Sequence, residues 1–317
     1  MEANVMDGDR ETMKNTHILY LLMEILVLLL KVIYYIFESM YHLIVPLKKK
    51  NVAGEIVLIT GAGHGIGKEL AIGYASLGAT VVCWDINEKT NNETMNDIKK
   101  IGRQSVYAYK CDVANREEVF RVAEKVKKEV GDVTILVNNA GIAFVKSFQN
   151  HSLDEIARVI DVNVTAQYWT LKAFLPSMIK NNYGHIVALS SVTAFIGAHC
   201  GTVYCPTKSA TKVLMEAMSE ELRALSNGKS SIKFTTVYPT LVHTGMCKKP
   251  KIRFPRIMGG LSPQYVASAI IDAQRRNYKD RSIPFHYLFI SNLIRYLPDK
   301  ALLSILDFFD SGVYPED

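Results

Sequence analysis

The sequence predicts an α/β protein built on a parallel, doubly wound sheet of about seven strands. Three observations lead to this prediction. Short apolar, β-branched runs alternate with helix-period patterns from Val52 onward. A glycine-rich turn follows the first run, Ile56 to Thr60, and Asp85 ends the second. Because parallel strands need a crossover between them, the alternation indicates right-handed strand–helix–strand units and a single Rossmann-like domain over residues 51–285.

The predicted elements follow one another through short loops, so no second core domain is expected. The expected strands lie near 56–60, 80–85, 105–110, 133–138, 184–190, 232–238 and 281–285. The expected helices lie near 65–77, 88–101, 115–130, 153–181, 203–226 and 263–276. Residues 286–317 are expected to form a C-terminal amphipathic extension, in which two helices divided by Pro298 suit a lid or a second membrane contact.

The first turn has the composition of an anion-binding site. Gly61, Gly63, Gly65 and Gly67 follow the first strand, and a helix-period pattern begins at Ile66. A helix that starts at such a turn directs its free amide groups to one point, and glycine lets a pyrophosphate approach the backbone without a Cβ in the way. Glycine-rich turns also occur for structural reasons alone, so the motif needs support from elsewhere in the chain.

Asp85 supplies that support. It lies eighteen residues past Gly67, where a carboxylate can hydrogen-bond a ribose 2′-hydroxyl and would repel a 2′-phosphate. We therefore expect dinucleotide binding, with NAD as the cofactor and NADP as the less favoured alternative. Asp112 follows the third strand, where an acid can receive the adenine amino group.

Polar residues also follow the next strands, at the edge where open α/β sheets bind ligands. A turn-forming quartet, Asn138 to Gly141, ends the fourth strand, and Ser190 and Ser191 end the fifth. Asn163 lies inside the predicted helix 153–181, an unusual place for asparagine unless its amide or its backbone has a use.

Tyr204 and Lys208 form the expected centre of the chemistry. They lie four residues apart at the start of a predicted helix and so share one face. A tyrosine hydroxyl has a pKa of about 10, and a neighbouring ammonium is expected to lower the pKa of Tyr204 toward the range useful for proton transfer. Ser191 is expected to hold a substrate oxygen. A lone Tyr-x-x-x-Lys is common by chance, but this pair is in register with both turns and the serine.

Together these motifs resemble the classical short-chain dehydrogenase/reductase family over about residues 53–285. Thr60-Gly61-x-x-x-Gly65-x-Gly67 is similar to the family's cofactor turn, and Asn138 to Gly141 is similar to its sheet-stabilising motif. The N-terminal apolar anchor, the basic triplet and the segments Gly54 to Thr60, Trp84 to Asn87 and Lys172 to Pro176 resemble the subgroup of 17-beta-hydroxysteroid dehydrogenases types 11 and 13 and epidermal retinol dehydrogenase 2.

The resemblance implies a catalytic tetrad. Tyr204 would be the general acid/base, and Lys208 would bind the nicotinamide ribose. Ser191 would orient the substrate, and Asn163 would hold a water in the proton relay. The implied cofactor-binding residues are Thr60, Gly61, His64, Gly65, Ile66, Gly67, Asp85, Asp112, Val113, Asn139, Ala140, Tyr204, Lys208, Pro239, Val242 and Thr244. No metal ligand is expected.

Three positions depart from the family pattern or qualify it. Thr240 stands where the family usually has glycine after the sixth strand, which puts the backbone geometry of that turn in doubt. Pro206 lies between Tyr204 and Lys208, and because proline is tolerated in a first helical turn, Tyr204 should begin its helix. His64 stands where some relatives carry a basic residue for a 2′-phosphate, which keeps NADP open.

The N-terminal fifty residues are expected to attach the protein to a membrane. Met1 to Asn15 is polar and expected to be disordered. Thr16 to Leu47 is strongly apolar, and its polar interruptions recur every seven residues, which places them in one stripe on a helix: His17, Glu24, Lys31 and Glu38. Such a helix can span the bilayer or lie in its interface. Lys48-Lys49-Lys50 is expected at headgroup level, which places the following domain in the cytosol.

Composition argues against several other classes of protein. The five cysteines (Cys83, Cys111, Cys200, Cys205 and Cys247) have no metal-ligand spacing and are expected to be reduced thiols. Nine Lys or Arg between Met246 and Arg281 face only two acids. No nucleic-acid recognition motif accompanies this basic cluster, so an anionic membrane surface or solvent is its expected surrounding.

Three functional hypotheses follow. The first is a membrane-attached, NAD-dependent dehydrogenase of a lipophilic alcohol such as a retinoid or steroid, or of the corresponding carbonyl. It would lie at the endoplasmic reticulum membrane or lipid droplets and form a homodimer through helices 153–181 and 203–226, as the resemblance implies. Phe144, Phe195, Val203 and the loop from Met246 to Met258 would line its substrate pocket. The alternatives are a low-activity lipid-droplet scaffold, which the intact tetrad argues against, and an NADP-dependent carbonyl reductase.

Overall fold

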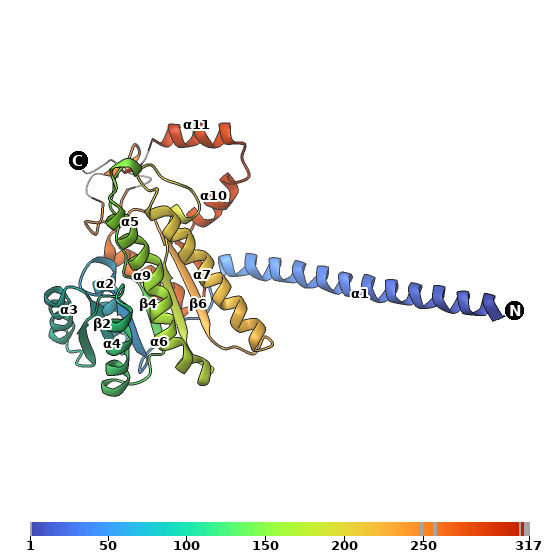
Figure 1. Cartoon of the computed structure of the whole chain (residues 1–317), viewed down its shortest axis with the longest axis horizontal. Helices are drawn as coiled ribbons and strands as arrows, with labels where there is room; N and C mark the ends of the chain where they lie inside the picture. Colours follow the sequence, from blue (N-terminus) through green and yellow to red (C-terminus); the bar gives the residue numbers. More distant parts are fainter. Residues whose placement is uncertain (1, 248–249, 256–258, 311, 314–317) are drawn as a thin grey trace. The chain divides into compact units, whose positions relative to one another are not determined.

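The computed structural model describes residues 2–247, 250–255, 259–310 and 312–313 of the chain (Figure 1). The chain divides into two compact units, Met1–Lys48 and Lys49–Asp317. The smaller unit consists of helix α1 (Glu2–Ile44) and the segment that follows it. The larger unit contains the sheet and the remaining helices.

Helix α1 is apolar over most of its length. Its stretch Thr16–Ile44 is long and apolar enough to cross a membrane, by length and composition alone. The helix continues back to Glu2, which differs from the disorder expected over 1–15. Extending an existing helix adds one hydrogen bond for each residue that is ordered, so a polar sequence can continue a helix that it would not nucleate.

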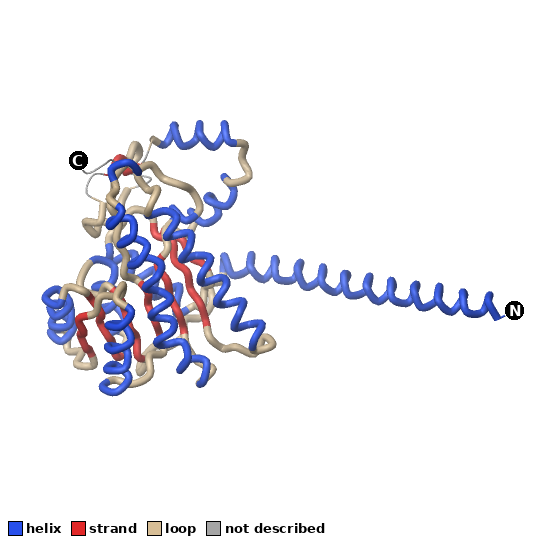
Figure 2. Tube along the Cα trace, in the orientation of Figure 1, coloured by secondary structure: helices blue, strands red, loops and turns tan. Residues whose placement is uncertain are grey.

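The larger unit is built on a seven-stranded parallel sheet with strand order β3-β2-β1-β4-β5-β6-β8 (Figure 2). The strands are β1 (Ile56–Thr60), β2 (Thr80–Asp85), β3 (Val106–Lys110), β4 (Ile135–Asn138), β5 (His185–Leu189), β6 (Lys233–Pro239) and β8 (Asp280–Ile283). The predicted doubly wound sheet is thereby confirmed, and each strand ends within two residues of its expected limits. The order reverses between β1 and β4, and this switch point is where such sheets bind ligands.

Helices cover both faces of this sheet. They are α2 (Gly65–Ser76), α3 (Glu88–Lys100), α4 (Arg116–Glu129), α5 (Leu153–Ile160), α6 (Ala166–Lys180), α7 (Tyr204–Leu225) and α9 (Pro263–Arg275). Successive strand residues point to opposite faces, so Leu58 joins one apolar core with α4, α6 and α7, while Ile59 joins the other with α2, α3 and α9. The C-terminal extension forms α10 (Tyr287–Ile294) and α11 (Asp299–Phe309) on either side of Pro298, as expected.

The helix predicted over 153–181 is interrupted in the structure. A π turn, Asp161–Thr165, separates α5 from α6 and contains Asn163. Short π insertions of this kind are rare and frequently occur at functional sites. The continuous-helix prediction was wrong here because the apolar periodicity continues across the turn while the asparagine side chain is used elsewhere.

Lys50 is attached to the base of the sheet through His185, the first residue of β5. Lys50 Nζ lies 2.9 Å from His185 Nδ1, and His185 Nε2 lies 2.8 Å from Thr235 Oγ1. The Thr235 hydroxyl donates to the Tyr278 carbonyl at 2.7 Å, so it accepts from Nε2–H, and Nδ1 accepts from the lysine. His185 is therefore neutral, and burial together with the charge of Lys50 lowers its pKa well below the usual value.

The neighbouring residue Lys49 is also engaged with the domain. Its ammonium pairs with Asp272 on α9 at 2.7 Å, and Arg275 Nε donates to the Lys50 carbonyl at 2.9 Å. Two of the three lysines expected at headgroup level thus contact α9 and β5, which offer them a carboxylate and a neutral imidazole.

We predict that His185 makes the protein less stable as the pH falls below about 6.5. In that range the unfolded chain binds a proton that the folded imidazole does not, so the free energy of unfolding should decrease by up to about 1.4 kcal/mol per pH unit. In urea unfolding between pH 5 and 7, the free energy of unfolding should change less with pH for His185→Gln than for the wild type. His199→Gln, at an exposed loop position, should keep the pH dependence of the wild type. The same pH dependence of the unfolding free energy in both variants would contradict the prediction.

Candidate active site

The glycine turn lies at the switch point, between the carboxyl end of β1 and the start of α2. Gly61 and Gly65 have φ angles of +68° and +56°, in the left-handed region that favours glycine. A Cβ on Gly67 would lie 2.0 Å from the Gly61 carbonyl oxygen, so the turn also requires glycine for close packing. His64 precedes the helix and makes no side-chain cap, which leaves the first amide groups of α2 directed outward for an anion.

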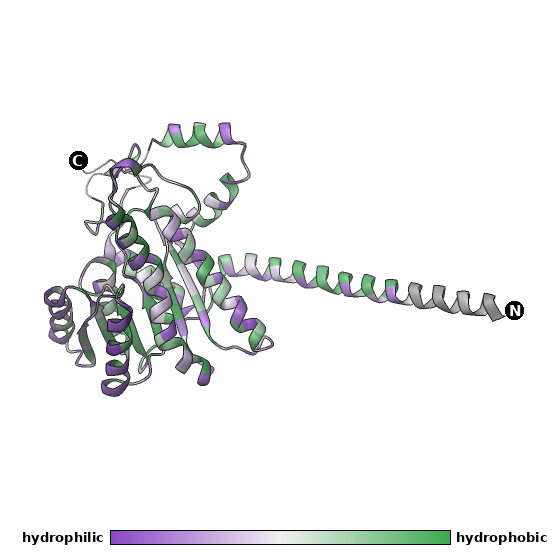
Figure 3. Cartoon of the chain, in the orientation of Figure 1, coloured by the Kyte–Doolittle hydropathy of each residue, from purple (hydrophilic) through white to green (hydrophobic). Residues whose placement is uncertain are grey.

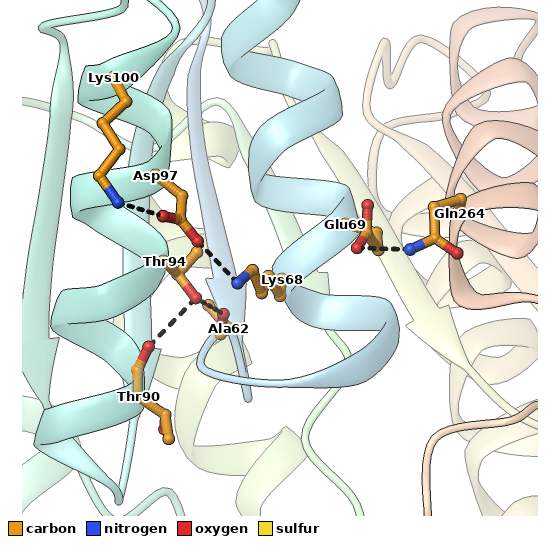
Figure 4. A network of polar contacts seen from close by, with 8 residues as sticks. All are labelled: Ala62, Lys68, Glu69, Thr90, Thr94, Asp97, Lys100 and Gln264. Carbon is orange, nitrogen blue, oxygen red and sulfur yellow. Dashed lines mark hydrogen bonds and ion pairs between the residues drawn. The ribbon is translucent and has the colours of Figure 1, made fainter.

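Side chains from three other elements hold this turn in place. Thr94 on α3 donates from Oγ1 to the Ala62 carbonyl at 3.1 Å (Figure 4). Asp85 Oδ2, at the end of β2, accepts from the Gly63 amide at 2.8 Å. Asn139 donates from Nδ2 to the Thr60 and Gly61 carbonyls at 2.8 and 3.2 Å. The turn is thus fixed before any ligand binds, which reduces the entropy lost on binding.

Thr60 connects the glycine turn with the turn after β4. Its buried hydroxyl oxygen accepts from the Asn139 and Ala140 amides at 3.0 Å each. The structure therefore brings together the two motifs that the sequence identifies separately. In the structure the Thr60 side chain contacts protein groups on both sides, so its contribution is to the shape of the site.

Asp85 and Asp112 differ in their partners. Asp85 accepts two backbone amides, Gly63 on Oδ2 and Asn87 on Oδ1, each at 2.8 Å, and retains further lone pairs for a ribose hydroxyl. Asp112 forms a two-pronged pair with Arg158 of α5, at 3.1 and 3.0 Å. The sequence analysis missed this arginine, because the two residues lie 46 positions apart and no motif contains Arg158.

Asn163 uses its side chain to join three elements. Its Oδ1 accepts from the Ile142 amide at 2.8 Å, and its Nδ2 donates to the Ile142 carbonyl at 2.9 Å and to Thr207 Oγ1 at 3.1 Å. The main-chain carbonyl of Asn163 accepts from Gln167 Nε2 at 2.6 Å. Both the amide and the backbone are therefore in use, as its unusual position suggests.

Tyr204, Ser191 and Lys208 lie together at the carboxyl edge of β5. Tyr204 begins α7, as Pro206 requires, and its hydroxyl is hydrogen-bonded to Ser191. Lys208 Nζ lies 5.4 Å from the centre of the Tyr204 ring and donates to the Leu189 carbonyl at 2.9 Å. An added Cβ on Gly141 would lie 3.4 Å from both Lys208 Nζ and Asn163 Oδ1, so Gly141 lies between two of the four predicted catalytic residues.

The expected direction of the Tyr204 pKa shift is contradicted. Burial raises the pKa of the Tyr204 hydroxyl above its usual value, and the hydrogen bond with Ser191 only partly opposes this effect. Burial also lowers the pKa of Lys208 to about 8. The sequence analysis counted the charge of Lys208 but not the cost of burying either group, and that cost is the larger effect here.

The turn after β6 accommodates its unusual threonine. Thr240 is not among the residues with positive φ, and its amide donates to the Ile283 carbonyl at 3.0 Å, so a Cβ causes no strain. A Cβ added to Gly65 would lie 3.0 Å from the Thr244 methyl group. Thr244 therefore lies beside the glycine turn. Ser191 Oγ also lies 3.5 Å from the Pro239 carbonyl oxygen.

The remaining apolar cofactor candidates belong to the two cores of the domain. Ile66 and Val242 are partly buried and pack on the core beneath α2, while Val113 belongs to the core on the opposite face of the sheet. Val242 is bridged to Leu261 in the segment before α9.

The residues expected to line the substrate pocket differ in how far they are buried. Phe195 and Val203 are buried, and the Phe195 ring packs on Tyr238 with ring centres 4.8 Å apart. Phe144 is only partly buried and carries Lys146 over its ring. In the loop from Met246 to Met258, positions 248–249 and 256–258 lie outside the described residues. Packing therefore accounts for Phe195, whereas Phe144 lies on the loop that follows Asn138 to Gly141.

The sequence of this chain matches the family model for short chain dehydrogenase over residues 55–252. The chain belongs to this family. Epidermal retinol dehydrogenase 2 of Mus musculus is 42% identical over 92% of this chain and 93% of the relative. 17-beta-hydroxysteroid dehydrogenase 13 of Homo sapiens is 39% identical, over 89% and 92% respectively. Short-chain dehydrogenase/reductase family 16C member 6 of Bos taurus is 45% identical over 77% of this chain and 76% of the relative. The resemblance inferred from the motifs is thus confirmed.

Solved structures share the same fold. A short chain dehydrogenase/reductase from Burkholderia phymatum, in complex with NAD, aligns over 77% of this chain and 94% of its own with a TM-score of 0.69 and 24% identity. A metagenomic short-chain oxidoreductase in complex with NADP aligns over 70% and 90% with a TM-score of 0.59 and 26% identity. Nicotinamide cofactors of both kinds therefore occur among the structural neighbours.

Proposed function

We propose that the protein is a membrane-associated, NAD-dependent oxidoreductase that interconverts a lipophilic alcohol, such as a retinol or a hydroxysteroid, and its carbonyl. The main support is that Tyr204 contacts both Ser191 and Lys208, while Lys208 and Asn163 lie on either side of Gly141 in the turn after β4. The substrate class is supported by the names of the relatives, which are retinol and hydroxysteroid dehydrogenases.

The turn residues have the chemistry that a dinucleotide requires. The amide groups at the start of α2 would hold the pyrophosphate, and Asp85 would accept a ribose hydroxyl. Lys208 would hold the nicotinamide ribose, with Val242 and Thr244 at the carboxamide. A bound nicotinamide supplies the carbon that takes or gives hydride. The negative charge of Asp85 favours NAD over NADP, because a 2′-phosphate would lie beside the carboxylate.

The chain's own residues would handle the substrate oxygen and its proton. Ser191 would hold the oxygen by a hydrogen bond, and Tyr204 would exchange a proton with it. Because the pKa of Tyr204 is raised, the neutral phenol is suited to donate a proton to a carbonyl. Oxidation of the alcohol needs a proton acceptor, and Lys208, with a pKa of about 8, lies next to the phenol.

We also propose the division of the chain and its location. Residues 1–50 would form the anchor and linker, 51–285 the catalytic domain and 286–317 a C-terminal extension. The apolar stretch Thr16–Ile44 supports attachment to endoplasmic reticulum or lipid-droplet membranes. Exposed apolar side chains on α6 and α7, such as Tyr168 and Val213, support a homodimer through these helices.

A turnover assay tests the proposal. Full-length protein in detergent should reduce NAD in the presence of all-trans-retinol or estradiol. The kcat/KM for NAD should exceed that for NADP by roughly tenfold or more, since about 1.4 kcal/mol of charge repulsion gives that factor. Preference for NADP would contradict the cofactor assignment. Absence of turnover with retinoids, steroids and fatty alcohols, with either cofactor, would support the scaffold hypothesis instead.

A further inference from the structure

Exposed apolar side chains are concentrated in the last two helices. Among the described residues, nine exposed large hydrophobic side chains lie between Phe285 and Phe308, whereas fourteen are spread over residues 49–284. Figure 3 shows the apolar colouring of α10 and α11. Such a concentration of exposed apolar side chains indicates an interaction site.

Helix α10 is apolar on its outer face as well as on its inner face. Tyr287, Leu288 and Ile294 are partly covered on the side that packs toward the domain. On the opposite side, Phe289 and Leu293 are 58% and 68% exposed, and Tyr296 beyond the helix end is 88% exposed. A helix on the surface of a soluble domain normally presents polar residues there, so the outer face lacks the partner that its composition requires.

The end of α11 is fixed to the segment that follows β6. Arg253 Nη1 donates to the Phe308 carbonyl at 2.6 Å, and Lys251 pairs with Asp310 at 2.5 Å. The Phe254 ring lies 5.6 and 6.1 Å from the rings of Phe308 and Phe309. The exposed apolar side chains of α11 are therefore held in position by the loop expected to border the substrate pocket.

We propose that α10 and α11 dock on a lipid membrane surface, with Phe289, Leu293, Tyr296 and Leu303 inserted at the boundary between headgroups and acyl chains. Arg295 and Lys300 are exposed at the turn between the two helices, where their long side chains can reach lipid phosphates while the apolar side chains insert. Mixed aromatic, aliphatic and cationic side chains of this kind suit an interfacial position.

A second feature of the chain favours lipid as the occupant over another protein. The apolar stretch Thr16–Ile44 belongs to the same chain, and a tethered bilayer would be present at high effective concentration near α10 and α11. This step rests on the membrane attachment proposed above, whereas the apolar face itself does not. Docking would place the loop containing Arg253 and Phe254 at the lipid surface, where a lipophilic alcohol is concentrated.

Tryptophan fluorescence of the full-length protein tests the proposal. Leu293→Trp, reconstituted in phosphatidylcholine vesicles with brominated acyl chains, should lose most of its added fluorescence relative to vesicles with ordinary chains. Leu225→Trp is the matched control, because Leu225 is also an exposed leucine, at 75%, but ends α7. The native Trp84 and Trp169 contribute the same background to both variants.

Equal quenching of both variants, or of neither, would overturn the proposal. Fluorescence of Leu293→Trp that depends on protein concentration and not on brominated lipid would assign the face to a second copy of the chain and also overturn it. Quenching does not depend on turnover. Selective quenching in a protein without dehydrogenase activity would therefore support the lipid contact and contradict only the proposed reaction.

Discussion

Replacement of Tyr204 by phenylalanine is expected to lower kcat/KM for the alcohol by roughly two to four orders of magnitude, the usual contribution of a positioned acid or base. The ring fills the same space at the start of α7, so Lys208 keeps its place 5.4 Å from the ring centre. Only the hydroxyl that is hydrogen-bonded to Ser191 is removed. Steady-state kinetics with NAD and the alcohol that the wild type oxidises fastest, together with NAD titration, separate the effect on chemistry from the effect on binding.

The control for this substitution is Tyr265→Phe, which removes a hydroxyl from an exposed position on α9. It should leave kcat and KM unchanged. Tyr204→Phe should also retain NAD affinity and thermal stability, because the variant keeps the glycine turn and the apolar contacts of the ring. Wild-type turnover by Tyr204→Phe would remove the phenol from the mechanism, whatever the substrate.

Because the pKa of Tyr204 is raised, the proposed oxidation needs another group as the final acceptor of the proton. A phenol whose pKa is raised by burial keeps its proton at neutral pH. It can relay a proton from one group to another, but it does not persist as a phenolate. Lys208, with a pKa of about 8, can lose its proton at mildly alkaline pH. In the proposed mechanism Lys208, and not the phenol, would therefore take up the proton that oxidation releases.

Local patterns predict the sheet because each strand is a short buried run bounded by turn residues, as in Ile56 to Thr60. The fold and family follow from these patterns and from the spacing of Gly61, Gly65 and Gly67. The π turn at Asn163 was only half predicted. The odd residue could be seen, but its partners Ile142 and Thr207 lie 21 and 44 positions away.

Contacts between distant residues account for the other differences. Arg158 pairs with Asp112, and Lys50 binds His185, 135 positions along the chain. Neither pair has a sequence signature, because a single arginine or histidine on a helix or strand can serve many purposes. Burial of charge is also a property of the folded domain, which is why the sequence analysis predicted the wrong sign for the Tyr204 pKa.

Replacement of Gly67 by alanine is expected to abolish measurable NAD binding and to destabilise the domain. The new Cβ would lie 2.0 Å from the Gly61 carbonyl oxygen and 2.6 Å from Asn139 Nδ2. Neither atom can move freely, because Asn139 holds the turn and Gly61 has a φ of +68°. Overpacking of this kind costs about 1–3 kcal/mol or more, although alanine is the better helix former by about 1 kcal/mol. Fluorescence titration with NAD and urea unfolding measure the two effects.

Gly197→Ala provides the matched control, since a Cβ at that position meets no atom within 4 Å. It should leave both NAD affinity and stability close to the wild-type values. Normal NAD binding by Gly67→Ala would show that the first turn of α2 is not the pyrophosphate site. Loss of binding with unchanged stability would have a different meaning. It would indicate that the turn relaxes at little energetic cost, and that the direction of its amide groups, and not its packing, is what the ligand requires.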